Sequence, residues 1–420
     1  MLTLPDEILI IRARDQDLPE MARLHYTAYP GIPLTLEQRI ENFRSDPRIS
    51  LEDRWVCLRK DRLVGMFNLY NFQMYRSGEL IPVGGIGGVA VSPEARREKI
   101  AYWMMMRAVR IMDKNGSPLS LLYPFRHNFY HRLGWGLIGR VQRYRFDPRS
   151  LPAYTDDKEN VCPVTTSEDQ EEVMSCYNRF AEKRNGLLRR DDPTWFETVF
   201  KNETCYAYRS SDSGKIEGYI LFKYKPLSEE TDFLDSDMSL REFVWTNQRS
   251  FRGLIGFLSA QRDQIRTIIY HDQSGLPFER LLTEPIAVGG QRNMPLGAET
   301  ATVGSNLMGR IIQLRRALAV SGIDSNVQGK VTLKITDDLN PKNSEPLTVE
   351  FDNGKIDFPR NGTAPLMLLT DIATFSAIYW GSLRLPEAIW LGLVEIDGKG
   401  DIGFFDRALG VPHPICLDYF

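Results

Sequence analysis

Apolar and polar positions along the first 150 residues alternate in a way that predicts a mixed α/β layer. Strand-like runs cover residues 8–12, 55–59, 63–71, 80–91 and 119–123, and the run at 80–91 is unusually rich in glycine. Helical spacing of apolar residues covers residues 18–28, 36–44 and 101–114, followed by a short helix at 129–133. Asp15 and Asp17 offer N-caps for the first helix, and Asn115-Gly116 closes the third. The order of elements places the centre of this layer near residue 90.

The middle of the chain repeats this order of elements. A polar stretch between residues 149 and 161 marks a boundary, after which helices are predicted at 166–183 and 252–262 and strands at 204–209, 216–225 and 240–245. This part lacks the glycine-rich strand and the basic turn of the first part. The pattern indicates a duplicated fold whose second copy has lost its ligand site.

Past Pro285 the pattern changes to that of a compact α+β unit. A helix is predicted at 307–319, with Leu307, Ile311, Leu314 and Leu318 on one face. Strands are predicted at 331–335, 347–351 and 355–358, the last two joined by the hairpin turn Asp352-Asn353-Gly354. Thr370 or Asp371 can cap a helix to residue 379, and another covers 385–393. We therefore expect three domains, at 1–150, 151–288 and 289–420.

The composition supports a globular protein with real cores. Of 420 residues, 42% are hydrophobic and 25% charged, which excludes disorder, a collagen-like fibre and a disulfide-stapled miniature. The net charge of −3 offers no overall attraction to nucleic acid. Five cysteines without a CxxC pair indicate a reducing compartment. With no apolar run of 18 residues and no signal-peptide pattern at the start, we expect a cytoplasmic protein without a membrane partner.

The most informative stretch is the end of the glycine-rich strand and the turn after it. The strand ends at Ser92-Pro93, Arg96 and Arg97 follow, and an amphipathic helix begins. A helix N-terminus attracts phosphate, and arginine adds the forked donors that phosphate favours. The backbone of Val89 and Val91 can pair with an amide-containing ligand arm. These features together fit a pyrophosphate joined to a pantetheine-like chain, whereas a solvated Arg-Arg pair at a helix start is the alternative.

This turn resembles the pyrophosphate loop of the GNAT acyltransferases, Gln/Arg-x-x-Gly-x-Gly/Ala. The matching residues are Arg96-Arg97-Glu98-Lys99-Ile100-Ala101, with Lys99 in the place of the central glycine. Glycine at that position lets the backbone approach the pyrophosphate closely. Lys99 can instead contact phosphate oxygens.

The whole chain resembles the enhanced intracellular survival (Eis) acetyltransferases. The resemblance rests on GGIGGVAVSPEARR, on HNFYHRLGWG downstream, on the three-part layout and on the aromatic C-terminus. It implies tandem GNAT-like domains, each a mixed central sheet with flanking helices, followed by a sterol-carrier-protein-like α+β domain. It also implies acetyl-CoA as cosubstrate, a homo-hexamer, and cofactor contacts from residues of the loop and of the segment after residue 123. These are Val89, Ala90, Val91, Arg96, Arg97, Glu98, Lys99, Ile100, Ala101, Tyr102, Phe125, Arg126 and Asn128.

The same resemblance implies two catalytic groups. Tyr130 is the general acid for the departing CoA thiolate, and a phenol with a pKa near 10 can share a proton with a thiolate. The α-carboxylate of Phe420 returns to the first domain as the general base for the attacking amine, and Asp418 and Tyr419 contact the substrate. Packing of the tyrosine ring and simple docking of the tail are the alternatives.

The expected reaction is direct attack by a cationic, aminoglycoside-like or polyamine-like substrate in a ternary complex. His127 and His131 stand four residues apart without a third ligand, so we expect no metal. Two other functions stay open. One is a carrier of an apolar ligand with a vestigial acetyltransferase domain, and the other is a protein-lysine acetyltransferase.

Overall fold

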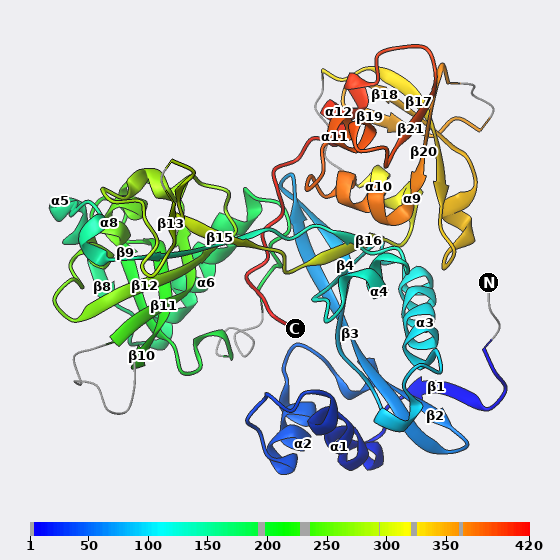
Figure 1. The fold of residues 1–420 in the computed structure, drawn as a ribbon, viewed down its shortest axis with the longest axis horizontal. Helices are drawn as coiled ribbons and strands as arrows, with labels where there is room; N and C mark the ends of the chain where they lie inside the picture. Colours follow the sequence, from blue (N-terminus) through cyan, green and yellow to red (C-terminus); the bar gives the residue numbers. More distant parts are fainter. Residues whose placement is uncertain (1–3, 192–197, 227–235, 294, 321–325, 361–363) are drawn as a thin grey trace. The chain divides into compact units, whose positions relative to one another are not determined.

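The computed structural model describes residues 4–191, 198–226, 236–293, 295–320, 326–360 and 364–420 (Figure 1). They form two compact units, Met1–Gly139 together with Asn306–Phe420, and Arg140–Ser305. These breaks fall at other positions than the predicted boundaries at 150 and 288. The predicted first and third domains also share one unit.

The first unit is built on a seven-stranded sheet in the order β1-β2-β3-β4-β5-β16-β6. All neighbours are antiparallel except β4 and β5, which are parallel. The strands are β1 (Ile8–Arg12), β2 (Arg54–Arg59), β3 (Arg62–Arg76), β4 (Glu79–Val91), β5 (Leu119–Leu122), β6 (Gly136–Leu137) and β16 (Met308–Ile311). The helices are α1 (Leu18–Ala28), α2 (Leu36–Ser45), α3 (Ile100–Asn115) and α4 (His127–His131). The elements predicted for residues 8–133 are confirmed, with small differences at their ends.

Helices cover both faces of this sheet, and strand alternation decides which side chain meets which helix. Trp55 and Cys57 of β2 belong to the core that contains α3, while Val56 between them belongs to the core under α1 and α2. The run Met104-Met105-Met106 on α3 is buried, as a core role requires. Gly116 closes α3 in the left-handed conformation, at a φ of 74°.

The second unit repeats this strand pattern, with the order β15-β7-β12-β11-β10-β9-β8. Its single parallel pair, β11 and β12, corresponds to β4 and β5. The strands are β7 (Val141–Phe146), β8 (Val161–Pro163), β9 (Thr204–Arg209), β10 (Ile216–Pro226), β11 (Ser236–Trp245), β12 (Ile265–Asp272) and β15 (Ala301–Gly304). The helices are α5 (Thr155–Lys158), α6 (Ser167–Glu182) and α8 (Gln248–Ser259). The predicted duplication is confirmed.

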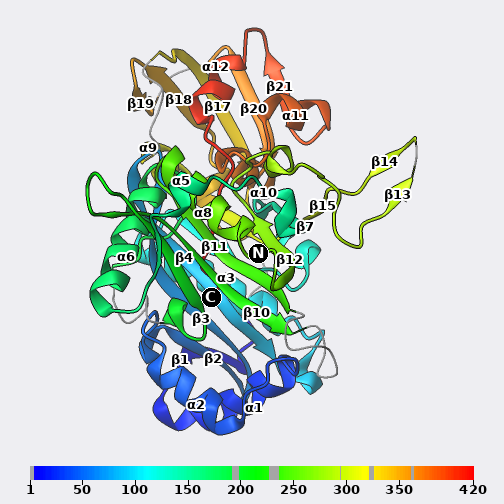
Figure 2. The ribbon, with the colours of Figure 1, turned by 90° about the vertical axis from the view of Figure 1, so that its left-hand side faces the viewer.

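A two-stranded hairpin, β13 (Arg292–Asn293) and β14 (Gly297–Ala298), pairs apart from the large sheet of this unit and reaches away from it (Figure 2). Within the described part of the chain, no helix is long and apolar enough to cross a membrane.

The predicted helix at 307–319 is wrong in its first half. Residues 308–311 form β16, which lies between β5 and β6, and α9 (Leu314–Ala319) begins only after it. All four residues of β16 are buried. A short run that is buried on both faces lacks a clear sequence period, whether it forms a strand or a helix, so its pairing partners decide its conformation.

The C-terminal part of the first unit carries its own sheet, in the order β19-β18-β17-β20-β21. The strands are β17 (Gly329–Thr336), β18 (Leu347–Asp352), β19 (Lys355–Asp357), β20 (Leu366–Asp371) and β21 (Glu395–Gly398). The helices are α10 (Ile372–Tyr379), α11 (Leu385–Trp390) and α12 (Gly403–Leu409). Asp371 caps α10 by accepting from the backbone of Ala373 and Thr374, as predicted. Asn353 and Gly354 both have positive φ, which the hairpin turn requires.

Candidate active site

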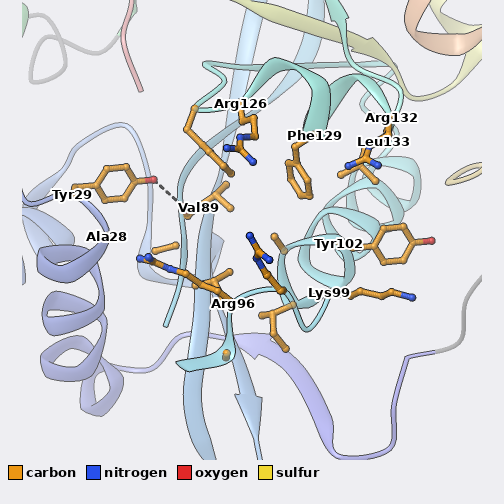
Figure 3. A pocket seen from close by; sticks show the side chains of 17 residues that line it. Ala28, Tyr29, Val89, Arg96, Lys99, Tyr102, Arg126, Phe129, Arg132 and Leu133 are labelled. Atoms are coloured by element: carbon orange, nitrogen blue, oxygen red, sulfur yellow. Dashed lines mark hydrogen bonds between the residues drawn. The ribbon is translucent and has the colours of Figure 1, made fainter. Parts of the chain in front are cut away.

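A cavity of about 1000 Å³ opens at the N-terminus of α3 (Figure 3). Its walls come from the end of α1, the end of β4, the turn before α3 and the segment that follows β5. The lining residues are Ala28, Tyr29, Val89, Ala90, Val91, Ala95, Arg96, Arg97, Lys99, Ile100, Ala101, Tyr102, Phe125, Arg126, Phe129, Arg132 and Leu133.

The cavity exists because β4 continues past the end of its parallel neighbour. β5 pairs with β4 only over Val83–Ile86, so the residues from Gly87 to Val91 have no partner on that side. Gly88 has a φ of 58°, and the register with β3 shifts at the same place. Exposed strand backbone therefore faces the cavity. The hydroxyl of Tyr29 donates to the carbonyl oxygen of Val89 at 2.8 Å.

The turn before α3 has the backbone conformation of an anion cradle. Arg97 and Lys99 have φ values of 68° and 63°, and Lys99 is the N-cap of α3 without a side-chain cap bond. Left-handed residues among right-handed or extended ones turn successive N–H groups toward one point, where the helix dipole adds positive potential. The left-handed conformation at residue 99 explains why glycine suits this position. In Figure 3 the Lys99 chain extends away from Val89, on the side of Tyr102.

The charges of the cavity have one sign. Arg96, Arg97, Lys99, Arg126 and Arg132 line it, and none of its lining residues is acidic. Guanidinium and ammonium groups beside a helix N-terminus favour a ligand with several phosphates.

Most of the predicted cofactor residues line this cavity. Glu98 and Asn128 do not. The carboxylate of Glu98 is paired with Arg59, and Asn128 is exposed. Six further residues line the cavity and were not predicted from the sequence: Ala28, Tyr29, Ala95, Phe129, Arg132 and Leu133. Phe129, Arg132 and Leu133 follow the predicted residues closely in the chain, so the sequence could have indicated them. Ala28 and Tyr29, at the end of α1, lie far from the predicted residues in the sequence, so nothing local pointed to them.

Tyr130 lies on α4 with its ring packed against two residues of the cavity wall. The ring centroids of Phe125 and Phe129 lie 5.4 and 5.0 Å from that of Tyr130. The side chain is only 2% exposed. Burial, and then the neighbouring Tyr29, raise the pKa of the Tyr130 phenol far above its ordinary range. The phenol therefore keeps its proton at neutral pH.

The C-terminal residue lies against the face of β4 that glycine leaves open. Gly85 and Gly87 are two residues apart and share one face of the strand. A Cβ atom on Gly87 would lie 2.9 Å from the terminal carboxyl carbon of Phe420, and one on Gly85 would lie 3.0 Å from its ring. The ring packs against Tyr70, Phe72 and Tyr123, with centroid distances of 5.6, 5.1 and 5.4 Å.

Two hydrogen bonds hold the tail in this position. Tyr123 Oη donates to the carbonyl of Asp418 at 2.8 Å, and Arg48 Nη1 donates to the carbonyl of Tyr419 at 2.7 Å. Asp418 is buried, whereas Tyr419 is 73% exposed.

Tyr29 connects the two halves of the site. Its presence disfavours ionisation of Tyr130, and Tyr419 in turn disfavours ionisation of Tyr29. Burial, and then Tyr419, raise the pKa of Tyr29 to about 12. The predicted acid, the cavity and the C-terminal segment thus belong to one neighbourhood. Among the residues with described positions, no three His, Cys, Asp or Glu side chains are grouped to hold a metal ion.

Comparison with known proteins relates three parts of this chain to domain families. Residues 10–138 and 186–311 each match an acetyltransferase (GNAT) domain family, and residues 314–417 match a sterol carrier protein domain. The N-acetyltransferase Eis of Mycobacterium tuberculosis (strain ATCC 25177 / H37Ra) is 26% identical over 236 residues. That alignment covers 53% of this chain and 56% of the relative, so the chain spans about half the length of the curated relatives it matches.

Solved structures share the complete fold. A GCN5-related N-acetyltransferase from Anabaena variabilis ATCC 29413 superposes with a TM-score of 0.82 at 18% identity, covering 98% of this chain and 100% of that one. Eis1 from Mycobacterium abscessus has a TM-score of 0.77 at 16% identity over the same shares of the chains. At these identities the likeness concerns the fold alone.

Proposed function

We propose that this chain, a member of the GNAT superfamily with two GNAT domains and a sterol carrier protein domain, is an acetyl-CoA-dependent N-acetyltransferase. The observation that carries the proposal is the cavity at the start of α3, with its five cationic side chains and no acidic one. We further propose cationic amines of the aminoglycoside or polyamine type as acceptors, in a cytoplasmic homo-hexamer.

The residues present fit acetyl-CoA. The left-handed turn at Arg97 and Lys99 supports a pyrophosphate cradle, and the unpaired end of β4 supports pairing with the amides of the pantetheine arm. The cofactor supplies the acetyl group as a thioester. Arg96 and Arg126 add charge-assisted hydrogen bonds to its phosphates.

Tyr130 Oη serves as the acid in this proposal. Its raised pKa keeps the phenol protonated, so the hydroxyl is a permanent hydrogen-bond donor. A donor with a pKa above that of a thiol stabilises a developing thiolate by sharing its proton rather than by losing it.

The carboxylate of Phe420 serves as the base. A free amine is protonated at pH 7, so the site must attract a cation and then remove one proton. A carboxylate is a weak base in water, and removal from water strengthens a carboxylate as a base. The carboxyl group of Phe420 lies against the backbone of β4 at Gly87. Asp418 and Tyr419 are the two tail residues proposed to bind the acceptor amine. Tyr419 is exposed to solvent, whereas Asp418 is buried.

The experiment measures acetyl-CoA consumption by the purified protein with a polyamine as acceptor. We expect turnover that falls more than tenfold both in Tyr130→Phe and in the chain lacking Phe420, with the affinity for acetyl-CoA kept. In Arg97→Ala the affinity should fall instead. A smaller loss in both of the first two variants contradicts the assigned roles, and no acetyl-CoA binding contradicts the function.

A second function, carriage of an apolar ligand, is favoured by the sterol carrier protein match at 314–417. Calorimetry separates the two. Binding of a lipid probe without binding of CoA supports the carrier, and CoA binding weakened by Arg97→Ala supports the enzyme.

A further inference from the structure

The helix that carries Tyr130 is too short to position its own side chain. α4 has five residues, and an isolated helix of that length is not stable in water. The turn after it closes on Tyr130, whose carbonyl accepts from the N–H groups of Leu133 at 3.0 Å and Trp135 at 3.1 Å. The position of Tyr130 therefore depends on what holds residues 133–135.

This turn borders two cavities, although Leu133, Gly134 and Trp135 are themselves buried. Arg132 and Leu133 line the 1000 Å³ cavity described above, and they also line a second cavity of about 230 Å³. Gly134 and Asp337 also line the second cavity. Because open space borders part of this buried turn, a directional contact adds to the packing that holds it in place.

Arg310 of β16 supplies that contact. Its Nη1 donates to the carbonyl of Leu133 at 2.7 Å, and its guanidinium carbon lies 5.2 Å from the ring centroid of Trp135. Gly134 has a φ of 92°, and a Cβ there would lie 1.5 Å from Arg310 Nη1. The turn is thus shaped to receive this guanidinium.

Arg310 is itself held by the sterol carrier part of the chain. Its Nη2 donates to both carboxylate oxygens of Asp337, at 2.6 and 2.8 Å, and both side chains are buried. Asp337 also accepts from the N–H groups of Leu339 and Asn340 and from Asn343 Nδ2. A buried ion pair whose carboxylate also accepts from several neighbouring groups has little freedom to move.

We propose that Arg310 is a positioning residue for Tyr130, through which the sterol carrier part fixes the acid of the first GNAT domain. The inference rests on the role proposed for Tyr130 and deepens it. The C-terminal part of the chain then acts on the reaction twice, once through the tail and once through Arg310. Arg310 contacts neither substrate nor cofactor in this role.

The test is a double-mutant cycle with Arg310→Lys and Tyr130→Phe. Lysine keeps the charge beside Asp337 but cannot donate to Asp337 and Leu133 in the same fork geometry. We expect kcat to fall about ten- to hundredfold in Arg310→Lys, with the KM for acetyl-CoA unchanged, because small misplacement of a reacting group costs that much. In the Tyr130→Phe background the same change should have almost no further effect.

A matched control is Arg190→Lys, which alters a buried bidentate pair with Glu242 in the second unit. It should lower the melting temperature without changing kcat. If Arg310→Lys does not fold, Gly134→Ala tests the same contact, since its Cβ displaces the turn while both charges stay.

The outcomes separate the two proposals. The positioning role is overturned if Arg310→Lys leaves kcat unchanged. It is also overturned if Arg310→Lys lowers kcat by the same factor in the Tyr130→Phe background as in the parent protein. Unchanged activity of Tyr130→Phe alone overturns the acid assignment of the proposed function, and the positioning role with it.

Discussion

Gly87 lies directly against the terminal carboxyl group of Phe420, with 2.9 Å between the position of a Cβ on Gly87 and that carboxyl carbon. The two residues are 333 positions apart in the chain. The absence of a side chain at residue 87 therefore creates the space in which the last residue of the chain sits.

Filling that space should displace the proposed base. In Gly87→Ala the new methyl group meets the carboxyl carbon and oxygen of Phe420 and the ring of Tyr70. We expect kcat to fall about tenfold or more with acetyl-CoA affinity kept, measured by steady-state kinetics and calorimetry. Gly31→Ala is the control, because nothing lies within 4 Å of a Cβ there. Full activity in Gly87→Ala would show that the carboxylate has no role at this position.

Loosening the tail should expose it to exopeptidase. Tyr123→Phe removes the hydrogen bond from Tyr123 Oη to the carbonyl of Asp418, a carbonyl to which the Cys416 thiol also donates more weakly at 3.4 Å. A hydrogen bond contributes about 1 kcal/mol, which corresponds to roughly a fivefold change in the detached population. Carboxypeptidase should release Phe420 about fivefold faster than from the parent protein. Tyr154→Phe, in the other unit, should leave the rate unchanged, and an equal rate in Tyr123→Phe would contradict the tether.

Replacing Lys99 by glycine separates the effect of backbone strain on stability from the effect of the lysine charge on binding. A non-glycine residue in the left-handed region is strained by about 1–2 kcal/mol, while glycine adds unfolded-state entropy of about 0.5–1 kcal/mol. Lys99→Gly should thus stabilise the fold by about 0.5 kcal/mol in denaturant titrations, and Asp61→Gly, at the same φ of 63°, should gain less because aspartate tolerates the left-handed conformation.

Only the first variant removes a cation from the cavity. We expect Lys99→Gly to bind acetyl-CoA several-fold more weakly at low salt, with a smaller salt dependence, and Asp61→Gly to bind normally. Equal affinity of the parent and Lys99→Gly would remove Lys99 from the proposed phosphate contacts.

Acid should destabilise the first unit through His25. Burial, and then Arg39 and Arg54, lower the pKa of His25 to about 4, against 6.5 in the unfolded chain. Between these values the unfolded state binds more protons, so the contribution of His25 to stability is lost as the pH falls from about 6.5 to 4. In His25→Gln the melting temperature should fall less over this interval. The exposed His127→Gln should follow the parent, and a parallel fall in all three proteins would contradict the assignment.

Several elements were predictable because their signals are local. Gly116 and Asp371 cap helices by their own backbone and side-chain geometry, and Asn353-Gly354 makes its turn for the same reason. A cavity also lies at the turn that the two arginines and the strand before them indicated, since the residues that build a helix N-terminus are consecutive in the chain. The cofactor roles of these residues stay predictions.

The strand β16 was not predictable in this way. Met308–Ile311 is buried on both faces although it contains Arg310, and its conformation depends on pairing with Leu119–Leu122, almost two hundred residues earlier. The sequence shows the glycines of β4 as a cluster. It does not show why side chains are absent there, because the residue that packs against Gly85 and Gly87 is Phe420, at the far end of the chain.

The sequence by itself determined the local elements, the duplicated order of strands and the basic turn before α3, since each depends on neighbours within a few residues. Only the tertiary structure decided which distant groups meet: Phe420 with Gly87, Arg48 and Tyr123 with the tail, and Arg310 with the turn beside Tyr130. Such contacts form when the folded core brings remote segments together. Their energy comes from complementary shape and hydrogen bonding across that distance, which no periodicity along the chain encodes.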